Sequence, residues 1–424
     1  MVSASLPTAS WFSFAPRAAG VAARMARCAR RGLAATVVVA GGALTGAPAP
    51  ANADTKPWAF LYGDRELFPS MLVSLTDDSP VLPRDPAQLG DTSGVIAARV
   101  RASRPDTRVT VTLAATSLFA ESSVTVVLPD TAEHLVAPTI RWDQERLARL
   151  RQPLANFVIK IAVHLDGEPP RDHYVKTVVH SVNDWLRAYM LRGRGPMLND
   201  TIQLAAAYVN ENNPAIERTI TFTAQQSKSV LFTGYRATAA GKPSQVSAAQ
   251  LEAIYNALRT LGLRYTALSQ PSYVAEADPK KARLYAQNVR LMGDALGAKQ
   301  ANSFETATLL AATYMKLGLQ VVLILFPNRD KSYHYTLVGV YEQPDTWRTD
   351  FNVLPLVIDP SSVSEMSYAE ALKSGRALLE ANKGRLVPLP PERAARRDGD
   401  RVDGYFWINL NDARMQGVLP IPEP

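Results

Sequence analysis

The chain has 424 residues, 47% of them hydrophobic and 20% charged, a composition typical of a globular protein long enough for two cores. Its formal net charge is +7, but the first 53 residues contribute five arginines and no acidic residue, so the rest carries 7 − 5 = +2. A nearly neutral chain gives no reason to expect nucleic acid or an anionic membrane as a partner.

The first 53 residues have the three parts of a secretory signal peptide. Basic residues between Arg27 and Arg31 precede an apolar stretch from Leu33 to Leu44, and Ala51-Asn52-Ala53 forms an A-x-A cleavage site. The apolar stretch is too short for a stable membrane anchor. We therefore expect export to the periplasm or the medium and a soluble product after cleavage near Ala53. The start codon, Met1 or Met25, and the route, Sec or twin-arginine, stay open.

Cysteine usage narrows the chemistry of the exported chain. The single cysteine, Cys28, lies inside the predicted signal. The mature chain is therefore expected to have no disulfide, no thiolate metal site and no cysteine nucleophile. Neither a cofactor nor a metal ion is predicted.

Residues 54–185 have the pattern of a β domain. Apolar residues alternate with polar ones over 109–113 and 157–163, and further strands are expected at 94–102, 122–128 and 174–182. Short strands at this spacing predict a sandwich of immunoglobulin-like type. Four of the five histidines fall here, on different strands, and are interpreted as unrelated surface positions: His134, His164, His173 and His180.

From residue 186 onward the pattern favours helices and strands together. Helices are expected at 202–209, from Ser247 with a capping box to Gln250, at 281–296, and at 368–380 with a capping box from Ser367 to Glu370. Strands are expected at 320–327, 333–341, 354–359 and 405–410, and an exposed basic, proline-rich loop at 388–401. The predicted fold class is thus α+β.

The segment Lys299–Pro327 places a hydroxyl at the mouth of a buried helix. Asn302 is a good N-cap, and Glu305 stands where a capping box needs an acid, so Ser303 should occupy the first helical position. The following residues are apolar nearly all round, and Gly318 suits the end of the helix. Ser303 would then lie beside unpaired N–H groups at the positive end of the helix dipole.

Two further residues complete a candidate catalytic set. His334 is the only histidine after residue 180 and begins an expected strand, while Asp359 ends the strand "LPLVIDP". If these strands are antiparallel neighbours, His334 and Asp359 meet at one sheet edge. A helix carrying Ser303 across that edge would supply nucleophile, base and orienter.

These residues resemble the transglutaminase-like superfamily, which shares the papain-like arrangement. In that family a cysteine opens the central helix, an acidic residue follows two positions later, and "LG" plus a branched apolar residue closes the helix. A strand, a histidine-led strand and an aspartate-ended strand come next. Here those roles fall on Ser303, Glu305, Leu317-Gly318-Leu319, His334 and Asp359. The resemblance covers roughly 230–385 within an expected domain of 186–424, preceded by the sandwich of 54–185.

The sequence departs from the family at the nucleophile, where Ser303 stands in place of cysteine. A cysteine thiol has an ordinary pKa of about 8.5, whereas the pKa of a serine hydroxyl is far higher, so serine is much harder to ionise. The leading hypothesis is a catalytically silent or weak protein that binds a peptide or protein of the cell envelope. The alternative is a peptidase, amidase or acyltransferase that uses Ser303. A third reading gives Ser303 no role beyond starting a helix. Substrate and oligomeric state are not indicated.

Overall fold

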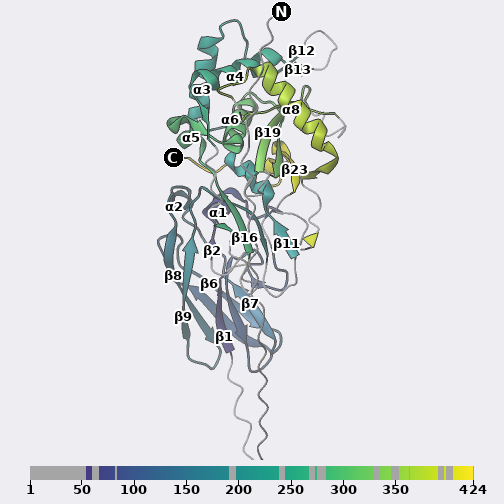
Figure 1. The fold of residues 1–424 in the computed structure, drawn as a ribbon. Coiled ribbons are helices and arrows are strands. Elements are labelled where there is room, and N and C mark those ends of the chain that lie inside the picture. Colours follow the sequence, from purple (N-terminus) through teal and green to yellow (C-terminus); the bar gives the residue numbers. More distant parts are fainter. Residues whose placement is uncertain are drawn as a thin grey trace, which may run out of the picture. The chain divides into compact units, whose positions relative to one another are not determined.

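A computed structural model describes residues 54–59, 66–81, 84–190, 197–237, 244–266, 273–274, 283–327, 334–344, 353–361, 363–389, 396–397 and 404–423. By its contacts the chain from residue 50 onward forms one compact unit. The fold is mixed α+β (Figure 1). The predicted signal peptide, residues 1–53, lies outside the described residues.

Two sheets built from the first part of the chain share one core. One has the order β1-β4-β7-β3 and the other the order β2-β9-β8-β5-β6. In the two segments predicted to alternate, 109–113 and 157–163, Val111 and Ile161 are fully buried. They share one cluster with Val100 and Val136 of the first sheet, which are also fully buried. The strands are β1 (Asp54–Ala59), β2 (Glu66–Leu67), β3 (Leu89–Gly90), β4 (Ile96–Arg101), β5 (Thr107–Leu113), β6 (Ser122–Leu128), β7 (Glu133–Ala137), β8 (Leu154–Leu165) and β9 (Arg171–Val179).

A third sheet follows, with the order β15-β16-β10-β11-β22. It corrects the predicted helix at 281–296: residues Arg283–Asn288 form β16, antiparallel to β10, and only Met292–Ala298 are helical, as α5. Leu284 and Ala286 are buried on the strand, so pairing with β10 overrides the helix-forming tendency of this stretch. The other strands are β10 (Asp184–Met190), β11 (Met197–Asp200), β15 (Tyr273–Val274) and β22 (Arg396–Arg397).

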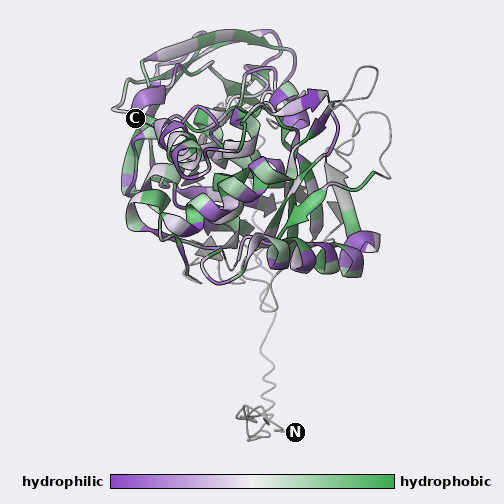
Figure 2. Ribbon diagram, turned by 90° about the horizontal axis from the view of Figure 1, so that it is seen from above, coloured by the Kyte–Doolittle hydropathy of each residue, from purple (hydrophilic) through white to green (hydrophobic). Residues whose placement is uncertain are grey.

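The fourth large sheet has the order β20-β19-β18-β23-β21 and packs against α6 (Ser303–Lys316) on one face and α8 (Tyr368–Asn382) on the other. Its strands are β18 (Val321–Pro327), β19 (His334–Val340), β20 (Leu356–Ile358), β21 (Leu386–Leu389) and β23 (Tyr405–Asn409). Alternate residues belong to two different clusters: Leu323 and Val338 join the main core with α6, whereas Ile324 and Leu337 join a second cluster with Leu379 of α8. Hydrophobic strands beside helices with one hydrophilic side are visible in Figure 2.

The expected strands of this sheet and the start and end of α8 are confirmed to within two residues. Of the loop predicted at 388–401, residues 388–389 belong to β21 and 396–397 to β22, and the remainder lies outside the described residues. Two small sheets pair β12 (Tyr235–Ala237) with β13 (Ser244–Val246) and β14 (Arg264–Tyr265) with β17 (Gln300–Ala301).

Of the three predicted capping boxes, those of Asn302 with Glu305 and of Ser367 with Glu370 are present, and that of Ser247 with Gln250 is not. Helix α4 (Ala248–Thr260) begins after Ser247 as predicted, but the Ser247 side chain makes no capping bond. The amide of Gln250 is instead fully buried and bonds both backbone groups of Gly234, at 2.8 and 3.2 Å. Its role is therefore to hold a neighbouring segment, and the predicted capping box is wrong. The remaining helices are α1 (Pro69–Ser74), α2 (Gln144–Ala148), η1 (Ile202–Tyr208, a 3₁₀ helix where 202–209 was predicted), α3 (Pro214–Gln226), η2 (Lys383–Arg385) and α9 (Leu410–Met415).

Across the predicted boundary near residue 185 the structure is continuous. The main core contains residues from both sides, and the C-terminal residues run back along the earlier part of the chain. Leu419 N–H donates to Ser74 O at 2.7 Å, and Ile421 N–H donates to Ala207 O at 2.8 Å. The division into 54–185 and 186–424 remains a prediction.

Candidate functional site

Ser303 occupies the first position of α6, as predicted. Asn302 Oδ1 accepts from Glu305 N–H at 2.9 Å, and Glu305 Oε2 accepts from Asn302 N–H at 2.9 Å, so both halves of the capping box are present. Glu305 Oε1 also accepts from the N–H of Arg290 at 2.8 Å. Burial raises the pKa of Glu305 although these backbone bonds oppose the shift. Glu305 is thus a structural cap for the helix.

The hydroxyl of Ser303 is enclosed and has no hydrogen-bond partner among the described residues. Its residue is 1% exposed. The next side chain, Phe304, stacks on Trp185 of β10, with ring centroids 4.9 Å apart and planes 18° apart. In the described part of the chain, Trp185 Nε1 and both amide atoms of its register partner Gln287 are likewise buried without a partner. Unpaired polar atoms therefore lie on both elements that meet at Phe304.

Neither Trp185 nor Gln287 was identified from the sequence. Each lies in a short strand more than 15 positions from Ser303, and only the pairing of β10 with β16 brings the two together. Buried polar atoms without partners are uncommon and indicate either a functional site or a bound water molecule.

His334 is the first residue of β19, and its backbone pairs with Pro327. Successive positions of a strand lie on opposite sides of the sheet. Position 334 is therefore on the same side as Thr336 and Val338, which is the α6 side, and Tyr335 is on the other side. The side chain of His334 lies outside the described part of the structure. At the level of the backbone, position 334 and Ser303 thus belong to the same side of the sheet.

Asp359 lies on the opposite side, beneath α8. It is 3% exposed, and the residue before it, Ile358, pairs with Val338. Asp359 Oδ1 accepts from Tyr335 Oη at 2.5 Å and from Ser361 Oγ at 2.8 Å and N at 3.0 Å, while Oδ2 accepts from Ser374 Oγ of α8 at 2.6 Å. Burial and the nearby charge of Asp359 raise the pKa of Tyr335 well above its usual range.

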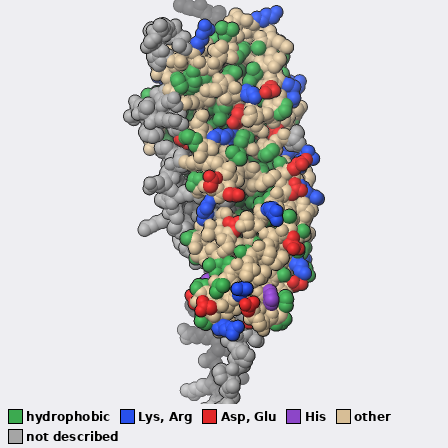
Figure 3. Space-filling view, turned by 180° about the vertical axis from the view of Figure 1, so that it is seen from behind, with side chains coloured by type: hydrophobic (Ala, Val, Ile, Leu, Met, Phe, Trp, Pro, Cys, Tyr) green, Lys and Arg blue, Asp and Glu red, His purple; other side chains and the backbone are tan. Residues whose placement is uncertain are grey.

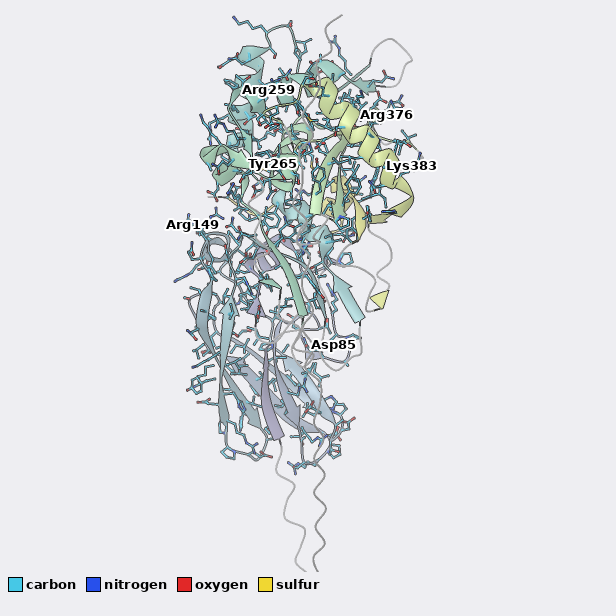
Figure 4. All side chains as sticks on the ribbon, viewed as in Figure 1. Asp85, Arg149, Arg259, Tyr265, Arg376 and Lys383 are labelled. Atoms are coloured by element: carbon cyan, nitrogen blue, oxygen red, sulfur yellow. The ribbon has the colours of Figure 1, made fainter. Side chains whose placement is uncertain are left out.

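Through these hydrogen bonds the carboxylate of Asp359, at the end of β20, links this strand to β19 and to α8. The close approach is reinforced at Gly375, where an added Cβ would lie 2.5 Å from Val357 O. The opposite side of α8 faces solvent with basic residues; Arg376 on the helix and Lys383 at its end are labelled in Figure 4. Of the predicted set, the structure brings Ser303 to the α6 side and Asp359 to the α8 side.

A second group of ionisable residues was missed by the sequence analysis. His180, interpreted there as a surface residue, is 7% exposed and stacks on Phe68 with ring centroids 4.1 Å apart. Its Nε2 lies 2.7 Å from Glu66 Oε2 and its Nδ1 lies 3.6 Å from Asp184 Oδ2. Burial lowers the pKa of His180, but the bonds to Asp184 and Glu66 outweigh it and raise the pKa to about 9.

This group joins three distant segments with one buried positive charge. Asp184 is further held by Asn288 Nδ2 at 3.0 Å, and its pKa is lowered by these partners against the effect of burial. An imidazolium between two carboxylates is a structural element here, since burial of an unpaired charge is costly. Sequence could not reveal it because Glu66 and His180 are 114 positions apart.

Among the described residues, no group of three or more histidine, aspartate, glutamate or cysteine side chains has the geometry to hold a metal ion. No helix in the same ranges has the length and apolar character needed to cross a bilayer. On the face drawn in Figure 3, basic and acidic residues are interspersed.

Neither protein-family models nor curated proteins give a match to this chain.

Proposed function

We propose that this chain is an exported transglutaminase-like protein that binds a peptide or a partner protein of the cell envelope with little or no acyl-transfer activity. An immunoglobulin-like sandwich, residues 54–185, would precede a papain-like domain, residues 186–424. The order of elements supports this proposal: the buried helix α6 is followed by β18, by a strand that begins at His334 and by one that leads into Asp359.

The main support for a non-catalytic role is that the carboxylate of Asp359 is already fully hydrogen-bonded on the α8 side. A serine–histidine–aspartate relay needs a carboxylate that accepts a hydrogen bond from the imidazole and holds its tautomer. Both oxygens of Asp359 already accept bonds, from Tyr335, Ser361 and Ser374. Hydrogen bonds to a charged group contribute about 1.5–3 kcal/mol each, so releasing the carboxylate toward the α6 side would be strongly unfavourable.

The state of Ser303 supports the same conclusion. A serine hydroxyl needs a base to remove its proton as it attacks, and it needs access to the substrate. Ser303 is 1% exposed, and its Oγ has no partner in the described part of the chain. An enclosed hydroxyl thus supports a role other than acyl transfer at Ser303.

Export rests on residues 1–53, which combine a basic region, an apolar stretch and the Ala51-Asn52-Ala53 cleavage site. Cleavage there would remove Cys28 and leave a chain without thiols, to act in the periplasm or the medium. Edman sequencing of the protein recovered from that compartment tests this part: an N-terminus at Asp54 supports it, and an intact Met1 or Met25 contradicts it.

The competing function, a serine peptidase, amidase or acyltransferase, draws on the unpaired Ser303 hydroxyl at a helix N-terminus, where backbone N–H groups can bind an oxyanion. A fluorophosphonate probe separates the two. We expect the wild-type chain and Ser303→Ala to show the same background labelling, with Ser374→Ala as the matched control. Labelling that disappears only in Ser303→Ala would establish the serine enzyme.

A further inference from the structure

The strand β6 forms an edge of the second sheet. Within the described residues it is hydrogen-bonded to β5 alone, and it ends the strand order β2-β9-β8-β5-β6. Its seven residues, Ser122–Leu128, include no charge, no proline and no glycine. An edge of this kind offers unpaired N–H and C=O groups to another strand.

The other sheet edges in the described part of the chain carry the protections that natural proteins use, which are short length, lysine and proline. Strand β1 is six residues long but contains Lys56 and Pro57. The remaining edge strands have two to four residues each: β2, β3, β15, β20, β21 and β22 of the larger sheets, and β12, β13, β14 and β17 of the two-stranded sheets. By this comparison β6 is the one long edge strand in these ranges left open to pairing.

We infer that β6 pairs antiparallel with β6 of a second copy of this chain, with Thr125 on the twofold axis. On the core side Val126 is in register with Val109 of β5, and Val124 with Val111. Pairing about Thr125 places Val126 opposite Val124 of the other copy. A row of four valines then crosses the interface, a favourable arrangement of β-branched neighbours.

The solvent side is self-complementary in the same register. Thr125 Oγ1 lies 2.9 Å from Thr110 Oγ1, so the twofold would extend this pair into a row of four threonines. Val127, which is 52% exposed, would face Ser123 of the other copy and lose part of that exposure. No charged side chain of β6 opposes its own copy, which is why a second copy fits this edge.

A neighbouring segment of the same chain limits the length of the open edge. It is hydrogen-bonded to the residues at and before the start of β6: Ser122 Oγ donates to Thr139 O, and Ala120 N–H donates to Arg141 O. The open edge therefore runs from Ser123 to Val127, five residues with Thr125 at the centre.

Cross-linking tests the register in the full chain with Cys28→Ser, which then has no cysteine. Thr125→Cys should give a covalent dimer with a short bismaleimide, because residues directly opposite lie about 5 Å apart. Ser123→Cys alone should not, since two such positions would lie four residues apart along the strand, about 14 Å. Thr112→Cys, on the same face of β5, is the matched control.

Charged substitutions at position 125 test the interface itself, with the fraction of dimer measured by light scattering after gel filtration. Thr125→Lys and Thr125→Glu each place like charges directly opposite and should weaken dimerisation about fivefold or more, whereas their mixture should restore the dimer. Thr112→Lys should dimerise like wild type. A monomeric wild type with no Thr125→Cys cross-link would overturn the inference, as would a dimer that is indifferent to both charges at position 125.

Discussion

This protein should become less stable as the pH rises above neutrality, because His180 then loses the proton that its two carboxylate partners stabilise. The group has a pKa of about 9 in the folded chain and an ordinary value of 6.5. Because the folded value is raised, the stabilisation is fully present below pH 6.5 and is lost as the pH rises through about 9. At about 1.4 kcal/mol for each pH unit, raising the pKa of His180 from 6.5 to about 9 corresponds to a loss of roughly 3–4 kcal/mol in the free energy of unfolding.

The assay is urea unfolding at a series of pH values between about 6 and 10. Wild type should lose most of this increment over that range, while His180→Gln should start lower and show a flatter dependence. His164→Gln, which changes an exposed imidazole on β8, should follow wild type. A wild-type curve parallel to that of His180→Gln would refute the argument that Glu66 and Asp184 hold a buried imidazolium.

Two further substitutions test local structure, each against a matched control. Gly375→Ala should destabilise the fold by about 1–3 kcal/mol, because the new methyl would lie 2.5 Å from Val357 O. Its control, Gly384→Ala, meets nothing within 4 Å and should show no such steric cost. Equal unfolding midpoints for the two variants would contradict the close approach of α8 to β20. Ser367→Ala should cost about 1 kcal/mol, because it removes a capping box. Ser247→Ala should cost much less, because the Ser247 hydroxyl makes no capping bond. Equal losses in urea unfolding would contradict this difference between the two helix starts.

Local signals in the sequence were sufficient where structure depends on nearby residues. The capping box of Asn302 and Glu305 places Ser303 at the helix start, and the continuous apolar run at 321–326 marks a strand buried on both faces. The same reasoning failed at 283–288, where the partner strand β10 lies about a hundred residues earlier. It also failed at Gln250, whose side chain bonds the backbone of Gly234 and not its own helix.

For the candidate site, sequence order indicated which strands are neighbours but not which side of the sheet each side chain takes. His334 and Asp359 were expected at one edge on the assumption that strand ends coincide. The register instead pairs Val338 with Ile358, so Asp359 falls opposite the neighbourhood of Leu337 and takes the side of Tyr335. A shift of one position along a strand reverses the face, and no local pattern specifies it.

The most direct test of the proposed function asks whether Asp359 acts on the chemistry of position 303. In the full chain with Cys28→Ser, Ser303→Cys gives a single thiol whose ionisation can be followed by its ultraviolet absorbance against pH. In a working triad, Asp359 would stabilise the imidazolium partner of the thiolate, so Asp359→Asn would raise the pKa of the thiol. We expect the same thiol pKa with and without Asp359→Asn, together with a loss of stability in the latter. A rise of about one unit or more, equivalent to about 1.4 kcal/mol, would contradict a purely structural role for Asp359 and restore the catalytic hypothesis.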